Sequence, residues 1–215
     1  MRCSYNLTSW AGILLLIGAA ASLAAGADNP LAACTACHGA KGEGIPALNA
    51  PAIAGQQAAY LERQLRNFRN ARRGAHPSDT AGAQMRALAA TLADDAVKKL
   101  AADIAALPGT PVASPATGDL HKGSNLYNGK CGTCHGGKAE GNPVLNAPRL
   151  AGLDAAYIKR QFAHFRDGAR GTNPQDTPGR QMAMIARTLP SERDLDDVIA
   201  FIHQLGRPKC FARWR

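Results

Sequence analysis

Two short stretches, Cys131-Gly132-Thr133-Cys134-His135 and Cys34-Thr35-Ala36-Cys37-His38, share the pattern Cys-x-x-Cys-His. This pattern is typical of covalent c-type haem attachment, in which both thiols bond to the haem vinyl groups and the adjacent histidine becomes an iron ligand. The alternatives are a zinc site built from two Cys-x-x-Cys halves and a redox-active disulfide. Neither alternative requires a histidine after each second cysteine, so the two stretches predict two covalently bound haem c groups.

The two motifs belong to a longer internal repeat. Cys131 follows Cys34 by 97 positions, and the same offset aligns about 60 further residues without a gap. The chain is therefore a tandem duplication, and we expect two copies of one fold. Matched pairs include Lys41/Lys138, Gly44/Gly141, Ala54/Ala151, Tyr60/Tyr157, Gln64/Gln161 and Phe68/Phe165.

The remaining segments divide the chain around these copies. Residues 1–27 combine a basic start, a short apolar run and an Ala-x-Ala end, which predicts a cleaved signal peptide and export. Residues 109–118 are rich in proline and glycine and carry no charge, which predicts a linker. We expect haem domains over 28–108 and 119–208 and a basic tail over 209–215. Cleavage leaves Cys210 as the one cysteine outside the two motifs, with no assigned role.

Apolar residues recur at helical spacing in both copies, and no alternating strand pattern appears, so the predicted fold class is all-α. We expect helices around Tyr60 to Phe68 and Tyr157 to Phe165, each closing near the glycines that follow, and last helices near 94–107 and 191–205. Ser191 or Asp194 is expected to cap the last helix. A helix over 119–128 precedes Cys131, whereas only residues 28–33 precede Cys34, so the first copy should have a stunted first helix.

Each iron needs a second axial ligand, and the repeat ranks the candidates. Met85 follows His38 by 47 positions, and Met182 follows His135 by 47. The predicted axial pairs are therefore His38/Met85 and His135/Met182. Met184 aligns with Ala87, so we expect it to be a packing residue. The histidines without a histidine partner in the other copy are expected on the surface or in loops: His76, His121, His164 and His203.

His/Met ligation fills both axial positions and leaves no site for oxygen or peroxide, which favours an electron carrier over an enzyme. A dihaem peroxidase would need one iron to lose its sixth ligand. A ligating imidazole also needs an acceptor for its other N–H. Pro51 and Pro148, each 13 positions after a motif histidine, are the candidates to present a fixed carbonyl; ordinary loop prolines are the alternative.

The formal charge is +9, and the excess lies in the second half. Residues 109–215 hold fifteen basic and nine acidic side chains, against nine and seven in residues 28–108. This excess favours docking to an acidic partner or to an anionic membrane surface. No nucleic-acid motif accompanies the charge, so we expect no nucleic-acid partner.

The motif order resembles that of the two-haem cytochrome c4 family of class I c-type cytochromes. The pattern Cys-x-x-Cys-His-Gly, then Ala-Gly-x-x-x-x-Tyr-x-x-Arg-Gln-x-x-x-Phe-Arg, then Gln-Met, occurs twice. The resemblance implies two tandem cytochrome c domains related by a pseudo-twofold axis, a bacterial periplasm, frequent membrane association and thioether bonds at Cys34, Cys37, Cys131 and Cys134. It also implies respiratory partners, such as a terminal oxidase or a quinol-oxidising complex. The alternative is the electron-accepting subunit of a periplasmic dehydrogenase.

Overall fold

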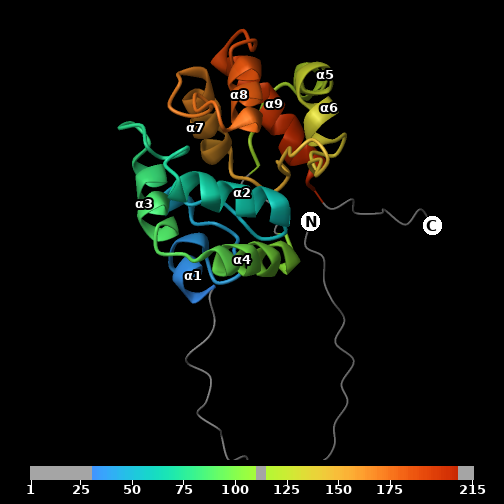
Figure 1. Cartoon of the computed structure of the whole chain (residues 1–215). Helices are drawn as coiled ribbons and strands as arrows, with labels where there is room; N and C mark the ends of the chain where they lie inside the picture. The colour runs from blue at the N-terminus through green and yellow to red at the C-terminus, as the bar shows by residue number, and fades with distance from the viewer. Residues whose placement is uncertain (1–30, 110–114, 208–215) are drawn as a thin grey trace, which may run out of the picture.

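The computed structural model describes residues 31–109 and 115–207 (Figure 1). Within these residues the only β pairing is two isolated bridges, Ile45–Ala50 and Asn142–Ala147. The all-α expectation is confirmed. The first half holds α1 (Ala32–His38), a 3-10 turn (Pro46–Leu48), α2 (Ala58–Arg69), α3 (Thr80–Ala89) and α4 (Asp94–Ala106). The second half holds α5 (Leu120–Lys130), α6 (Gly132–His135), α7 (Ala155–Arg166), α8 (Thr177–Ala186) and α9 (Glu192–Leu205).

The last helix of each half forms the core. α4 buries one face, with Val97, Leu100 and Ile104 at most 4% exposed, and packs against α2. α9 buries Val198 and Ile202 in the same way. Ser191 caps α9, because its Oγ accepts the backbone N–H of Asp194 at 3.2 Å. These contacts follow from the three- and four-residue spacing of the apolar positions.

α3 and α8 form although sequence periodicity does not predict them. Each begins at a buried aspartate: Asp79 accepts the Gly82 N–H at 2.9 Å, and Asp176 accepts the Gly179 N–H at 3.2 Å. A side-chain acceptor at this position satisfies a helix N–H that has no partner within the helix. These caps start the two helices that carry Met85 and Met182.

The two halves differ before the motif. α5 packs along α9 in the second half, with Tyr127 and Phe201 ring centroids 5.7 Å apart. In the first half α1 begins at Ala32, two residues before Cys34. Correspondingly, Asp103 of α4, which binds Lys99 at 2.7 Å, stands where α9 has Phe201.

Several predicted segments lie outside the described residues. These are the signal peptide, linker residues 110–114, and residues 208–215 with Cys210. Among the described helices, none is long and apolar enough to cross a bilayer.

Candidate functional site

The two Cys-x-x-Cys-His motifs sit on short helices that end at the histidine. Gly39 and Gly136 follow with φ of 84° and 83°, a conformation that favours glycine, and this turn ends each helix. His38 and His135 are 6% and 5% exposed. The motif thus places an imidazole inside each half, while its cysteines are half-buried or exposed.

A proline carbonyl orients each buried imidazole. His38 Nδ1 lies 2.8 Å from Pro51 O, and His135 Nδ1 lies 2.8 Å from Pro148 O. A carbonyl only accepts, so Nδ1 carries the proton and Nε2 keeps a lone pair for a metal. Burial lowers the pKa of both histidines, opposed in part by the carbonyl bond, and this favours the neutral imidazole that a metal requires.

The loop between histidine and proline is fixed by its own backbone. His38 O accepts the Gly44 N–H at 2.7 Å, and His135 O accepts the Gly141 N–H at 2.7 Å. Both glycines have φ near 85°, and a Cβ at Gly44 would meet the backbone of residues 50–52. Glycine at this position lets the chain fold back and bring the proline carbonyl to the imidazole.

In the second half the motif opens onto a cavity that is continuous with solvent. Cys131, Cys134 and His135 line one side, and Met182 reaches it from α8. Further walls are apolar and include Phe162, Phe165, Val198 and Ile202. Two thiols, an imidazole, a thioether and an apolar wall are the donor set and surroundings that a covalent haem requires, so the residues fit this group.

The first half repeats the motif geometry. His38 is buried and bonded to Pro51 as His135 is to Pro148. Met85 is half-buried on α3, which packs against α2, at the position equivalent to Met182 on α8.

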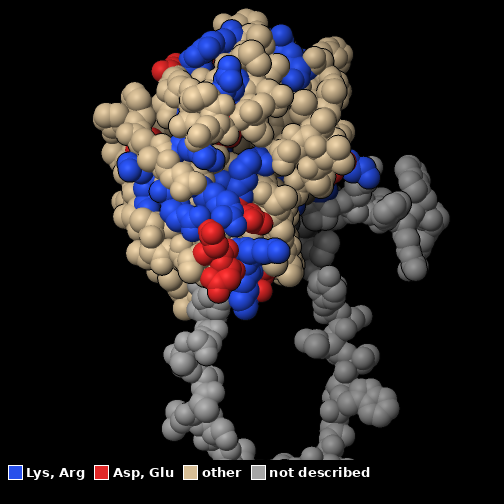
Figure 2. Space-filling model, viewed as in Figure 1, with Lys and Arg blue, Asp and Glu red and all other residues tan. Residues whose placement is uncertain are grey.

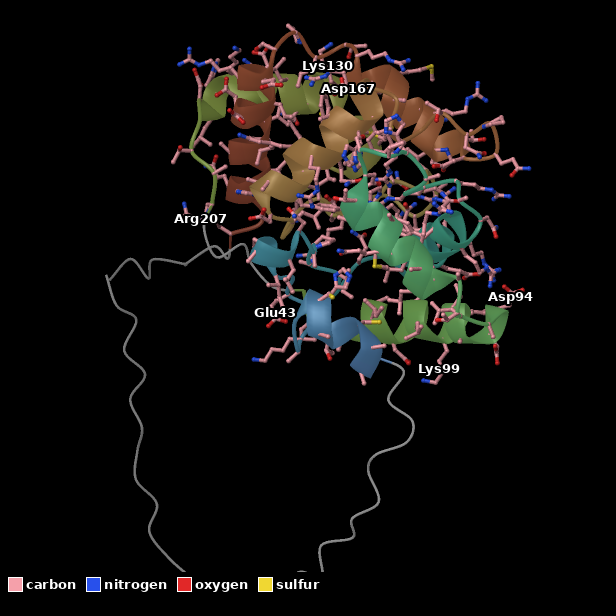
Figure 3. All side chains as sticks on the ribbon, turned by 90° about the vertical axis from the view of Figure 1, so that its left-hand side faces the viewer. Glu43, Asp94, Lys99, Lys130, Asp167 and Arg207 are labelled. Atoms are coloured by element: carbon pink, nitrogen blue, oxygen red, sulfur yellow. The ribbon has the colours of Figure 1, made fainter. Side chains whose placement is uncertain are left out.

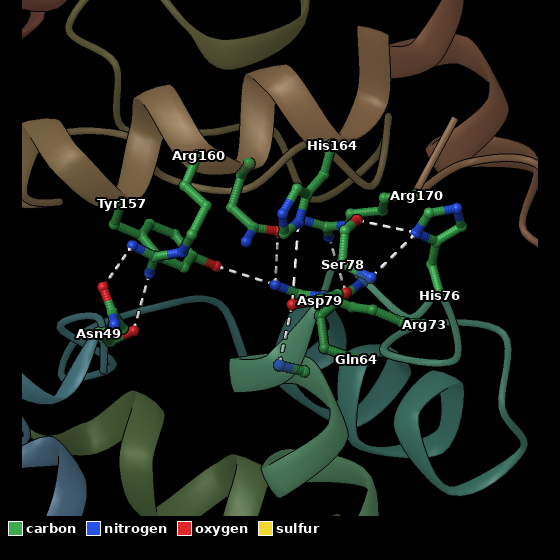
Figure 4. A network of polar contacts seen from close by, with 12 residues as sticks. Asn49, Gln64, Arg73, His76, Ser78, Asp79, Tyr157, Arg160, His164 and Arg170 are labelled. Carbon is green, nitrogen blue, oxygen red and sulfur yellow. Dashed lines mark hydrogen bonds and ion pairs between the residues drawn. The ribbon is translucent and has the colours of Figure 1, made fainter. Parts of the chain in front are cut away.

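The two halves meet through an exchanged polar network that sequence reasoning missed (Figure 4). Arg73 donates to Gln64 of its own half and, at 2.9 Å, to Gln161 of the other. Arg170 donates to Gln161 and, at 2.9 Å, to Gln64. All four residues recur at the offset of 97, and this recurrence is the feature of the sequence that could have indicated a contact made by both copies.

A second exchanged pair lies beside this network. Arg63 donates to Asn146 Oδ1 at 3.0 Å and to Asn146 O at 2.7 Å, and Arg160 binds Asn49 in the same way. Each bond has an equivalent with the halves interchanged, which is the pattern of a pseudo-twofold axis.

The interface is rich in buried cationic donors. The arginines of the two exchanged contacts each have a buried Nε with no partner among the described residues: Arg63, Arg73, Arg160 and Arg170. The second-half cavity extends to this interface, because Tyr60, Arg63 and Gln64 of the first half also line it. Arg63 and Arg170 line the cavity, and their charged guanidinium groups, each with an Nε that has no partner among the described residues, suit the carboxylates of haem propionates.

Two expectations about other residues are wrong. His203 is 3% exposed rather than a surface residue: its Nδ1 accepts the Ala116 N–H at 2.8 Å and its Nε2–H donates to Leu153 O at 2.9 Å. Met184 is 61% exposed rather than packed, because α8 turns it away from the core. His164 is partly buried, with Nδ1 3.8 Å from Asp79 Oδ1 across the interface.

A helical fold used twice around buried Cys-x-x-Cys-His sites defines a two-domain c-type cytochrome. The cytochrome c family model matches residues 23–107 and 120–206. The chain belongs to the cytochrome c4 family: it is 34% identical to a cytochrome c4 of Azotobacter vinelandii, over 88% of this chain and 90% of that protein.

Other comparisons agree with this family. A thiosulfate dehydrogenase electron acceptor of Stutzerimonas stutzeri is 30% identical over 85% of this chain and 83% of its own length. The crystal structure of reduced recombinant cytochrome c4 from Pseudomonas stutzeri matches with a TM-score of 0.64 and 30% identity, over 80% of this chain and 93% of that one. The chain is therefore an electron carrier with two haem c groups and two tandem cytochrome c domains. The halves described above are called the first and second domains from here on.

Proposed function

We propose that this protein passes single electrons between respiratory partners in the periplasm, with its irons held by His38/Met85 and His135/Met182. The observation that carries the proposal is that His135 and Met182 line one largely apolar cavity together with Cys131 and Cys134. The haem iron supplies a reversible one-electron couple, and a thioether ligand raises its potential.

The residues around each site have separate tasks. The proline carbonyls hold the imidazoles in one orientation, and the apolar walls exclude water. The interface arginines offer compensation for propionate charge. Filling both axial positions leaves no place for a substrate, so this arrangement suits electron transfer.

The first experiment tests export and loading. The protein produced in a bacterium that matures c-type cytochromes should be recovered from the periplasm with Asp28 as its first residue. Its mass should equal residues 28–215 plus two haems. A chain that retained residues 1–27, or that carried a single haem, would contradict the proposal.

The second experiment tests the electron-carrier role. A neutral quinol should reduce both haems, an external oxidant should reoxidise them, and hydrogen peroxide should be turned over no faster than by free haem. Rapid peroxide turnover would instead identify a dihaem peroxidase.

A second candidate is the electron-accepting subunit of a periplasmic dehydrogenase. It is favoured by the similarity to a thiosulfate dehydrogenase electron acceptor. Thiosulfate plus a periplasmic extract of the producing cells should then reduce the holoprotein, whereas extract alone should not. Equal reduction rates with and without thiosulfate would leave the general carrier as the better account.

A further inference from the structure

The mouth of the second-domain cavity is marked by residues that both line the cavity and face solvent. Lys130 and Cys134 border it on the motif side, and Gln181 and Ile185 of α8 border it on the other. A partner that exchanges electrons with this domain through the cavity opening would contact these exposed residues on both sides of it.

The two domains differ in several exposed side chains, at Lys130, on the loop before the proline and on the helix that carries the methionine. At five exposed positions the second domain carries a cation or a large apolar side chain where the first carries alanine. The pairs are Lys130/Ala33, Val144/Ala47, Arg180/Ala83, Met184/Ala87 and Arg187/Ala90. At these five exposed positions the second domain therefore has the larger or charged side chain, whereas at the half-buried Arg86 the first domain has the cation and the second has Ala183.

Three of these five side chains lie along one side of α8 and its C-terminal end. Arg180 and Met184 of α8 and Arg187, which caps the end of α8, are spaced i, i+4 and i+7, next to Gln181 and Ile185, which line the cavity. α8 itself, Thr177–Ala186, contains no acidic residue. The three side chains thus form a basic stripe with a methionine at its centre.

The apolar side chains of this surface are exposed and take no part in lining the cavity. Met184 is 61% and Val144 is 88% exposed, and neither lines the cavity. Exposed large apolar side chains among cations are typical of interaction sites, where the apolar centre excludes water and the charged rim steers the partner.

We propose that the second-domain mouth surface, formed by Lys130, Val144, Arg180, Met184 and Arg187, docks an acidic electron-transfer protein. The equivalent surface of the first domain, with alanines at the same positions, does not dock it. Charge complementarity selects this occupant, because all three charged members of the surface are basic. The proposal rests on the electron-carrier function above and specifies where its partner binds.

The test uses reduced plant-type ferredoxin, a small acidic donor, as the probe. One electron leaves the ferredoxin cluster and reduces one ferric haem, with no bond made or broken. In the holoprotein, the triple variant Lys130→Ala/Arg180→Ala/Arg187→Ala should lower the second-order rate constant at low salt by about 30-fold and flatten its salt dependence. An unchanged rate constant overturns the proposal.

A matched control removes the same charge elsewhere. Lys41, Lys98 and Lys99 are exposed on the first domain, and Figure 3 shows Lys99 at the opposite end of the molecule from Lys130. Their triple alanine variant should lower the rate constant by less than about 3-fold. Equal losses in the two triple variants would show that only net charge acts, which contradicts a located surface.

The apolar centre is tested separately. Met184→Ala should lower the rate constant about 5-fold with an unchanged salt dependence, because it removes contact area but no charge. Met184→Leu should retain the rate constant. Loss in both variants, or in neither, contradicts an apolar contact at this position.

Two further readouts separate the possible failures. Reduction by a neutral quinol should be the same in all variants; if the unaltered holoprotein fails this reaction, the proposed function itself is wrong. If the mouth variant loses binding to anionic lipid vesicles but keeps its rate with ferredoxin, the surface binds a membrane and the proposal is overturned.

Discussion

Arg73 of the first domain donates to Gln161 of the second at 2.9 Å, and its equivalent Arg170 donates to Gln64 at the same distance. The same glutamine oxygens also accept from the arginine of their own domain. Each guanidinium therefore bridges the domains. The fork geometry of arginine suits this arrangement, whereas lysine offers a single ammonium.

Arg73→Lys should loosen the interface. It removes bonds to Gln64, Tyr157 and Gln161 that are buried or half-buried, at a cost of ~1–3 kcal/mol. Calorimetry of the holoprotein should show the unfolding transition of the chain separate into two. Arg72→Lys, a change at the adjacent half-buried position, is the control and should preserve a single transition. Identical traces for the two variants would contradict the bridging role.

Two glycines of α5 should respond oppositely to alanine. A Cβ at Gly123 would meet the backbone carbonyl of Asp197 where α5 crosses α9, so Gly123→Ala should destabilise the second domain by ~1–3 kcal/mol. A Cβ at Gly129 would have nothing within 4 Å of it, so Gly129→Ala should stabilise by about 0.5–1 kcal/mol. Denaturant unfolding of the two variants measures both. The helix crossing would be misplaced if Gly123→Ala were neutral.

His203 should make the second domain sensitive to acid. Burial lowers the pKa of His203, and the Leu153 bond and Asp154 oppose this shift. Protonation of Nδ1 would also remove the acceptor for the Ala116 N–H. The unfolded chain then binds the proton first, so stability falls as pH drops below the ordinary histidine pKa of about 6.5. Unfolding free energies at pH 7.5 and 5 should differ less in His203→Gln than in the unaltered protein. An equal pH dependence in both would exclude His203 as the source.

Basic side chains also gather over α2 on the face shown in Figure 2, with acidic ones directly below. Two arginines of α2 are paired with carboxylates: Arg66 binds Glu62 and Asp94, and Arg69 binds Asp94. Exposed pairs of this kind contribute little stability. Because these cations have carboxylate partners, they should contribute less to docking than the cations of the second-domain mouth surface. Arg66→Ala should therefore leave the rate constant for reduction by ferredoxin within about 2-fold. A loss as large as that of the mouth variant would place the docking site over α2 instead.

The sequence predicted the helical class, the duplication and the last helices, because a periodic apolar face and a fixed offset are local signals. It missed α3 and α8, which depend on the aspartate caps rather than on apolar spacing. It also missed the burial of His203, whose two partners lie 87 and 50 positions away. Arg73 and Gln161 both recur at the offset of 97, but their pairing depends on how the two copies pack, which the sequence does not give.

The exposure of Met184 is another feature that the sequence did not predict. Alanine at the equivalent position suggested packing, and the repeat alone cannot say which face of α8 points outward. Cavity lining separates the two methionines, since Met182 borders the cavity with His135 and Met184 does not.

The most direct test of the account is the methionine-to-iron charge-transfer absorption of the ferric protein. The unaltered holoprotein should show the band for both haems, Met85→Ala and Met182→Ala should each lose about half of it, and the double variant should lose all of it. Met184→Ala should leave it intact. A band that survives the double variant, or that disappears with Met184→Ala, would contradict the proposed His/Met sites.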